Sequence, residues 1–200
     1  MEKINDRPYN YQNDNKAIHA IAYVDGSAQC GYTALCIAVS KETSNDSFVF
    51  KYGSMLESPG PMRSYLLKKL VQKENGQRLG ASSLAYFYSL QYLNETKQIR
   101  TVQHYVESAG TLEGLKEAID NGYCLVLSTM LTGVGHFITV LGYDDAGNLI
   151  CHDPAGNHAE GYFNKNGAHV RYNIEKMKAY LKPPSFPWYG GFRYIAVKPV

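Results

Sequence analysis

The sequence predicts an α+β fold in which a helix that begins at a cysteine packs on a mainly antiparallel sheet. Three observations predict it: a strand-turn-strand pattern runs from Gly135 to Asp153, a helical pattern begins near Cys30, and further helical stretches lie between the two. The chain has 200 residues, of which 44% are apolar. That is enough for one sizeable core, so we expect a single domain over residues 1–200.

The predicted hairpin brings a histidine close to a carboxylate. Phe137–Tyr143 is β-branched and aromatic, Asn148–Cys151 is apolar again, and the sequence DDAG between them suits a tight turn. A loop of two or four residues puts Asp153 on the same side of the ribbon as His136, whereas a loop of three reverses this. With both on one side, the carboxylate can orient the imidazole for base catalysis.

The predicted helix places a thiol where an anion is favoured. In QCGYTALCIAVS the apolar residues from Ala34 to Val39 fit the buried stripe of a helix that begins near Cys30 or Gly31. The unsatisfied amides and the dipole at a helix N-terminus lower the pKa of a thiol, and a nearby imidazolium lowers it further. Cys36, nearly two turns along, is expected to be an ordinary core residue.

The rest of the chain supplies the other elements of an α+β fold. We expect residues 1–28 to be mostly loop, with a short apolar piece at 18–24. Helical spacing and caps predict helices at 63–72, 81–94, 111–121 and 174–181, the last ended by Pro183 and Pro184. Strands are expected at 102–107, 123–129, shortly before residue 174, and at the end of the chain.

Composition argues against several classes of protein. The net charge is only +2 and the basic residues are scattered, so nucleic acid is not an expected partner. No run is long enough to span a membrane, and the amino terminus lacks a signal-peptide core. Four cysteines without metal-site spacing are expected to be free thiols, with no metal and no cofactor: Cys30, Cys36, Cys124 and Cys151.

The 17 tyrosines, against one tryptophan, have two interpretations. Packing in and around the core is the ordinary one, and a groove that stacks on sugar or peptide is the alternative.

Three segments together resemble the papain-like cysteine peptidases. They are QCGYTAL around Cys30, the run LEGLKEAIDNGYCLVLS followed by GHFITVLGYDDAGNLICHDPAGN, and the amino-terminal YQNDNK. The resemblance is closest to the branch typified by bacteriocin leader-processing peptidases, and within it to phage and bacterial cell-wall relatives. It implies a papain-like fold and a Cys-His-Asp triad.

The resemblance also implies the role of each site residue. Cys30 is the nucleophile, His136 the base and then the acid, and Asp153 orients the imidazole. The Cys30 backbone amide is one oxyanion donor, and in this family an upstream glutamine usually supplies the other. Gln12 matches that glutamine best, although an insertion around HAIAYVDGS lengthens its separation from Cys30 and leaves Gln29 as a competitor.

Each neighbouring polar residue also has an alternative interpretation. His152 is expected to face away from the site, and His158 to lie on a surface loop. Asn157 could orient His136 if the hairpin register differs. Asp144 and Asp145 are interpreted as turn residues and not as calcium ligands.

The functional hypothesis is therefore a thiol hydrolase, a peptidase or amidase acting on a peptide or amide bond in bacterial peptidoglycan, as an endolysin does. Without a signal peptide, it is expected in the cytoplasm of the producing cell, acting at the cell wall after release or as part of a virion. The alternatives are an inactive wall-binding or virion module, and an intracellular cysteine peptidase or acyltransferase. The bond and the oligomeric state stay open.

Overall fold

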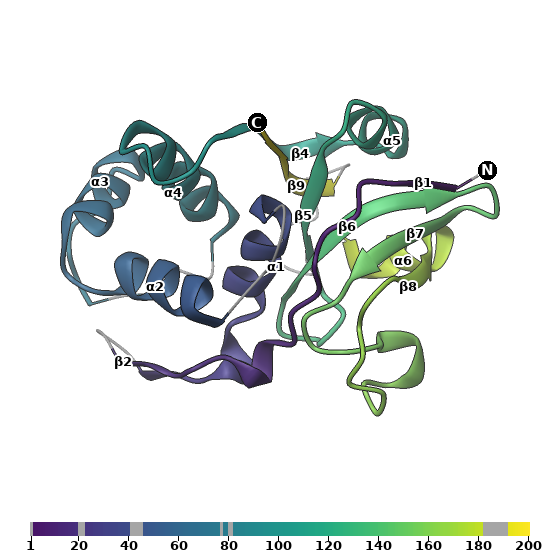
Figure 1. Cartoon of the computed structure of the whole chain (residues 1–200), viewed down its shortest axis with the longest axis horizontal. Coiled ribbons are helices and arrows are strands. Elements are labelled where there is room, and N and C mark those ends of the chain that lie inside the picture. Colours follow the sequence, from purple (N-terminus) through teal and green to yellow (C-terminus); the bar gives the residue numbers. More distant parts are fainter. Residues whose placement is uncertain (1, 20–22, 41–45, 77, 80–81, 182–191) are drawn as a thin grey trace.

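An antiparallel sheet forms the centre of the protein (Figure 1). The computed structural model describes residues 2–19, 23–40, 46–76, 78–79, 82–181 and 192–200. Within this part of the chain the sheet has seven strands in the order β4-β9-β5-β6-β7-β8, with β1 added beside β6. The strands are β1 (Glu2–Ile4), β4 (Thr101–Gly110), β5 (Cys124–Thr129), β6 (His136–Asp144), β7 (Asn148–His152), β8 (Val170–Asn173) and β9 (Phe192–Pro199).

Helices cover both faces of this sheet and enclose two hydrophobic cores. One core is formed with α1 (Cys30–Val39), α2 (Asp46–Glu57), α3 (Pro61–Lys69) and α4 (Ser83–Glu95), which lie together on one side of the molecule (Figure 1). The other is formed with α5 (Leu112–Asp120) and α6 (Ile174–Leu181). Short elements complete the chain: β2 (Ile18–His19), β3 (Tyr23–Val24), and the 3-10 turns η1 (Gln12–Asp14), η2 (Gly26–Ala28) and η3 (His158–Glu160).

The central helix α1 is buried on nearly all sides, from Gly31 to Ala38. Its sequence is apolar almost throughout, as a helix enclosed by other elements requires. The Thr139 hydroxyl on β6 donates to the Ala34 carbonyl at 2.7 Å, and the Asn15 amide donates to the Thr33 hydroxyl at 2.8 Å. These bonds hold the beginning of α1 between the sheet and the amino-terminal segment.

A buried charged group supports α1 from the side of α2 and α3. Tyr32 on α1 donates its hydroxyl to Glu57, and both side chains are buried. The other Glu57 oxygen accepts the Leu79 amide at 3.2 Å and lies 3.9 Å from Nη1 of Arg63. Buried carboxylates need such partners, because an unpaired charge in the interior is costly. The group therefore ties three helices together.

The β6-β7 hairpin departs from both loop lengths that we favoured. Tyr143 pairs with Leu149, and the strands end at Asp144 and begin at Asn148, so the loop has three residues. That loop alone would separate His136 and Asp153 to opposite faces. A β-bulge between Val140 and Gly142 shifts the register by one residue and restores them to the same face. His136 and Asp153 therefore share a face, as predicted, but the bulge brings this about and not a loop of two or four residues.

Most predicted elements are present near their expected bounds. Thr111 caps α5 by accepting the Gly114 amide, and α1 begins at Cys30. The elements that were not predicted are α2, β1, the two-residue strands β2 and β3, and the three 3-10 turns. Pro183 and Pro184, expected to end α6, lie outside the described residues.

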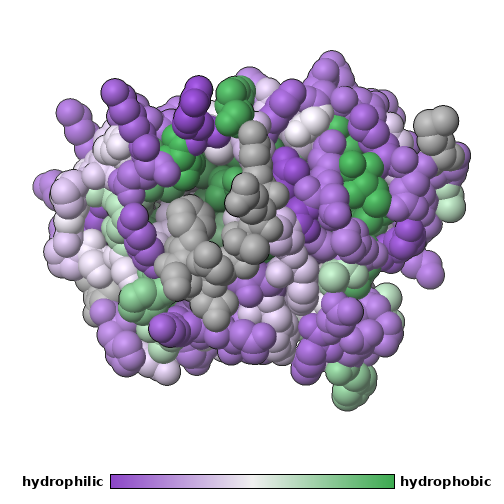
Figure 2. Space-filling view, viewed as in Figure 1, coloured by the Kyte–Doolittle hydropathy of each residue, from purple (hydrophilic) through white to green (hydrophobic). Residues whose placement is uncertain are grey.

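The surface seen in Figure 2 is mainly hydrophilic, with several separate apolar areas. In the described part of the chain, no helix has the length and apolar character to cross a membrane.

Candidate active site

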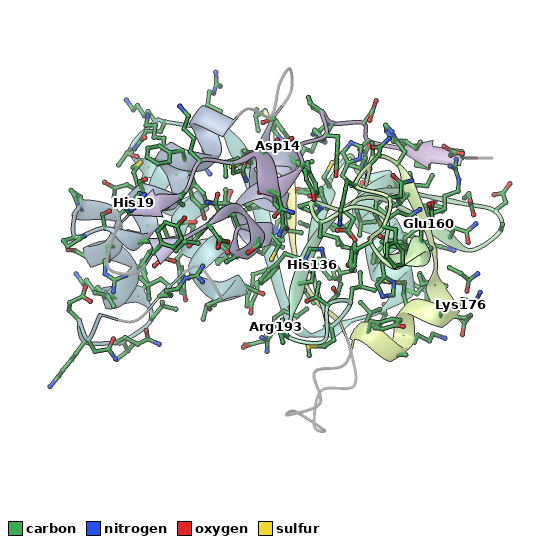
Figure 3. All side chains as sticks on the ribbon, turned by 90° about the horizontal axis from the view of Figure 1, so that it is seen from below. Asp14, His19, His136, Glu160, Lys176 and Arg193 are labelled. Carbon is green, nitrogen blue, oxygen red and sulfur yellow. The ribbon has the colours of Figure 1, made fainter. Side chains whose placement is uncertain are left out.

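The hairpin register joins His136 and Asp153 directly. Nε2 of His136 lies 2.7 Å from Oδ1 of Asp153, and both side chains are buried. In Figure 3, His136 lies near the middle of the molecule, between the helices and the sheet. Gly135, with a φ of 102°, precedes it in a backbone conformation that favours glycine. Because Nε2 is engaged, Nδ1 is the ring nitrogen left for a second partner.

That second partner is the thiol of Cys30. The Cys30 thiol lies close enough to His136 and to the backbone of Phe137 and Gly31 for these groups to stabilise its thiolate. Burial raises the pKa of the Cys30 thiol, but the His136 side chain and the two backbone groups outweigh it, so the pKa lies below its usual value. The first turn of α1 contains no acidic residue and has no side-chain cap. Its free amides therefore also favour a thiolate.

The pKa of His136 is shifted upward, in the opposite direction to that of Cys30. Burial lowers the pKa of His136, but its hydrogen bond with Asp153 and the nearby Cys30 thiol prevail and raise the pKa to about 10. A lowered thiol pKa beside a raised imidazole pKa favours a thiolate-imidazolium pair at neutral pH. Such a pair is a nucleophile together with its proton donor.

Two tyrosines hold the far oxygen of Asp153. Tyr172 on β8 donates its hydroxyl to Oδ2 of Asp153 at 2.7 Å, and Tyr162 approaches the same oxygen at 3.4 Å. Oδ1 accepts the Ala155 amide at 2.9 Å besides its bond with His136. The carboxylate is fully buried, and these donors replace the water it has lost. Asp153 is therefore fixed in position.

The amino-terminal segment passes beside the same carboxylate. The Tyr9 hydroxyl lies 3.1 Å from the Asp153 carbonyl oxygen and accepts the Gly167 amide at 3.1 Å. The Asp153 amide donates to the Gly167 carbonyl at 2.9 Å. A Cβ at position 167 would lie 2.0 Å from the Asp153 carbonyl oxygen, so this close approach requires glycine.

Gln12 and Gln29 are both buried, but their amides are differently engaged. Gln29 donates Nε2 to the carbonyls of Lys16 and Val24, at 2.9 and 3.0 Å, which uses both N–H groups. Gln12 donates Nε2 to the Ser27 carbonyl at 2.8 Å, which leaves one N–H. Gln29 therefore braces the loop before α1, and Gln12 retains a donor.

The position of Gln12 connects both sides of the site. Its backbone amide donates to the Pro154 carbonyl at 2.9 Å, directly after Asp153. Its side chain bonds to Ser27 in η2, three residues before Cys30. A Cβ on Gly26 would lie 2.6 Å from the Gln12 carbonyl oxygen, so η1 and η2 are in close contact. The insertion around HAIAYVDGS therefore leaves Gln12 next to the segment that leads into α1.

The remaining residues considered from sequence lie outside this hydrogen-bond chain. His152 faces away, with Nε2 2.6 Å from the Arg7 carbonyl and Nδ1 accepting the His169 amide at 3.1 Å. Asn157 caps η3 by accepting the Ala159 amide. Cys36 is buried, and burial raises its pKa. All four cysteines are free thiols.

Asp144 acts within the hairpin turn. It accepts the backbone amide of Asn148 at 2.9 Å and also the side-chain amide of Asn148 at 2.9 Å. Turn formation, as expected, therefore accounts for this carboxylate.

Among the described residues, one group has metal-ligand chemistry, formed by Asp6, His152 and His169, whose ligand atoms lie within 4.8 Å of one another. Both ring nitrogens of His152 already bond to backbone groups, and His169 pairs with Asp6 at 2.8 Å. A metal ion would have to displace these bonds, so the group fits an ion poorly.

Sequence reasoning did not identify the tyrosines around Asp153. Tyr162 and Tyr172 lie in and after a Gly- and Asn-rich loop, where the sequence gives no periodic signal. Their abundance was interpreted as packing or as a stacking groove, and hydrogen bonding to the carboxylate was not considered. A pair of tyrosines shortly after an Asp-Pro turn is the signal that could have suggested it.

The fold and the site define the class of protein. A helix begins at a cysteine and packs on an antiparallel sheet, and the sheet positions a histidine next to an aspartate. This is the papain-like cysteine peptidase architecture. A model of the Peptidase_C39-like family matches residues 4–180. The chain belongs to that family.

A solved structure supports the fold. A Bacillus anthracis protein described as a C39-like peptidase superposes with a TM-score of 0.50 at 14% identity, over 98% of this chain and 97% of that one. UfSP from C. elegans matches over 100% of this chain and 34% of its own, at 18% identity and a TM-score of 0.40, which is too low to support an argument. No curated protein matches the sequence.

Proposed function

We propose that the protein is a cysteine-dependent hydrolase that cleaves a peptide or amide bond, with Cys30, His136 and Asp153 as its triad. The observation that supports this most strongly is the 2.7 Å hydrogen bond between His136 and the buried Asp153, beside a Cys30 thiol whose pKa the same imidazole lowers. A buried histidine and aspartate serving only structure would not need a partly exposed thiol at the start of a helix.

The proposed first step is attack by the Cys30 thiolate on the substrate carbonyl carbon, which forms a carbon–sulfur bond. The carbonyl oxygen becomes an anion, stabilised by the Cys30 backbone amide and the remaining Nε2–H of Gln12. The His136 imidazolium then gives its proton to the leaving nitrogen as the carbon–nitrogen bond breaks. The amine product departs and leaves a thioester on Cys30.

In the second step neutral His136 takes a proton from water, and the resulting hydroxide attacks the thioester. The carbon–sulfur bond breaks, a carboxylic acid is released, and the thiolate-imidazolium pair is restored. Asp153 keeps the ring oriented and stabilises its charged form throughout. Tyr172 and Tyr162 hold Asp153 in this position.

For the substrate we propose bacterial peptidoglycan. The support is the resemblance of the three sequence segments to phage and bacterial cell-wall relatives. Two exposed apolar side chains also lie close in sequence to site residues: Val134, 92% exposed, precedes His136 by two positions, and Phe163, 91% exposed, follows Tyr162. They could contact an apolar part of the substrate. On this proposal the protein reaches the wall after release from its producing cell or as part of a virion.

The test is digestion of purified peptidoglycan from several bacteria, followed by mass spectrometry of the released fragments, with Cys30→Ser as the inactive control. New amino termini would identify an endopeptidase, and freed sugar–peptide linkages an amidase. His136→Ala should abolish release, whereas Asp153→Asn should reduce it less completely, because the base remains.

Two outcomes would contradict the proposal. Sedimentation of the protein with walls, without any fragments, would support a binding module instead. Hydrolysis of small peptides but not of walls would keep the thiol mechanism and reject the wall substrate.

A further inference from the structure

A cleft lies at the end of β5 that is farther from the candidate active site. It has a volume of about 460 Å³ and lies between α5 and the adjoining face of β4 and β9. In Figure 1, α5 stands beside the upper ends of β4 and β5. Thr129, at the far end of β5, pairs with His136. Six residues of extended strand separate Tyr123 in the cleft from Thr129, a distance of about 20 Å.

One hydroxyl in the cleft is accessible to a ligand. Tyr194 on β9 is 5% exposed as a whole residue and lines the cleft, and its hydroxyl oxygen is not one of the fully buried, unsatisfied polar atoms of the described residues. A Cβ built on Gly114, in the first turn of α5, would lie 3.8 Å from this oxygen, which places the hydroxyl beside the helix. A hydroxyl that is accessible in the cleft can donate to a ligand and accept from it.

The cleft also presents one group of each charge. Glu117 on α5 and Lys198 on β9 both line it, yet they form no ion pair with each other, and the Glu117 carboxylate has no bonding partner in the described part of the chain. Lys198 donates to the Asn121 carbonyl at 2.9 Å, which leaves two of its three N–H groups. Burial, followed by the charge of Glu117, raises the pKa of Tyr194, so its hydroxyl stays protonated.

One wall of the cleft is aromatic. His104 and Tyr123 pack with ring centroids 5.3 Å apart and are joined by a 3.1 Å hydrogen bond between Nε2 and the hydroxyl. Lys198 lies over the Tyr123 ring, 5.8 Å from its centroid. The apolar part of a ligand can pack here beside the charged groups. The size of the cleft falls within the usual range for small-molecule sites.

We propose that this cleft binds a small zwitterionic ligand, a free amino acid or a short peptide with both termini charged. The ligand's ammonium group binds Glu117 and the Tyr194 hydroxyl oxygen, its carboxylate binds Lys198, and its side chain packs against Tyr123. A ligand with only one charge would leave the other charged group without its partner. The site is separate from the catalytic residues and does not depend on the proposed hydrolase activity.

The test is isothermal titration of the Cys30→Ser protein with the dipeptide alanyl-phenylalanine, since this variant cannot hydrolyse the probe. We expect saturable binding, weakened at least about tenfold by Glu117→Gln, by Lys198→Gln, and by acetylating or amidating the dipeptide. Glu113→Gln and Lys116→Gln, on the same helix but outside the cleft, should bind as the parent does. NMR signals of Ala118 and Ala196 should shift.

Tyr194→Phe separates a binding role from a structural one. Removing a hydroxyl that is accessible in the cleft should leave the melting temperature unchanged or raise it, while affinity falls about two- to tenfold. Absence of saturable binding would overturn the proposal, as would equal affinity for the acetylated dipeptide. Shifts confined to residues around Cys30 would also overturn it, because they would place the dipeptide in the active site.

Discussion

Tyr172→Phe should weaken the candidate site without removing any of the three proposed catalytic residues. The phenol donates to Oδ2 of Asp153 at 2.7 Å and accepts the His158 amide at 3.0 Å. In the variant, Oδ2 keeps only the longer 3.4 Å contact with Tyr162. A buried hydrogen bond to a charged group contributes about 1.5–3 kcal/mol. The free energy of unfolding should therefore fall by about 2 kcal/mol.

The same change should also alter the chemistry of His136. A carboxylate that is held less firmly supports the imidazolium less well, so the pKa of His136 should fall from its raised value of about 10. Denaturant unfolding measures the stability, and the pH dependence of kcat/KM measures the pKa. We expect kcat/KM at neutral pH to fall about tenfold, equivalent to about 1.4 kcal/mol.

A matched control tests whether burial is the cause. Tyr143 also donates its hydroxyl to a carboxylate, Asp120, at 2.9 Å, but at the surface. Tyr143→Phe should leave both stability and the pH profile unchanged, because water replaces the lost bond. If Tyr172→Phe behaved like Tyr143→Phe, or unfolded the protein without moving the pH profile of the folded fraction, the Tyr172 hydroxyl would not support His136 through Asp153.

Three further predictions follow from the site geometry. The profile of kcat/KM against pH should be bell-shaped. Activity should fall as pH drops through the lowered thiol pKa of Cys30, and fall again as pH rises through about 10, where His136 loses its proton. A midpoint near 6.5 on the alkaline side would contradict the ion pair. Gln12→Ala should lower kcat by about 10²–10³-fold if its free N–H stabilises the oxyanion. Gln29→Ala should mainly lower the free energy of unfolding, by about 1–3 kcal/mol, because two buried hydrogen bonds are lost. The reverse pattern would exchange the roles of the two glutamines. Cys36→Ala should keep activity, since this thiol is buried in the core, and selective loss of activity in a folded variant would mean that the wrong cysteine was chosen.

The order of elements and the three proposed catalytic residues were predictable because they depend on local patterns. The apolar period after Cys30, the turn at Asp144 and the strand beginning at His136 are each visible within a few residues. The hairpin register was not fully predictable. The three-residue loop would have placed Asp153 on the wrong face, and the bulge beside Gly142 that corrects it carries no clear sequence signal.

Contacts between distant segments were the least predictable part. Tyr9 and Gln12 approach Asp153 and Pro154 across more than 140 positions of the sequence. The choice between Gln12 and Gln29 depended on which backbone carbonyls lie nearby, and those come from loops whose conformation the sequence does not specify. Strand β1 is only three residues long and is ordered by pairing with β6, so its own residues give little signal.

The most direct test of the central claim is competitive alkylation of the four free thiols with limiting iodoacetamide below neutral pH, with each cysteine quantified by peptide mass spectrometry. We expect Cys30 to react first, because it alone of the four has both a lowered pKa and partial exposure, and we expect His136→Ala to slow its reaction at least about tenfold. Equal labelling of all four thiols, or an unchanged Cys30 rate in His136→Ala, would contradict the thiolate-imidazolium pair on which the proposed mechanism rests.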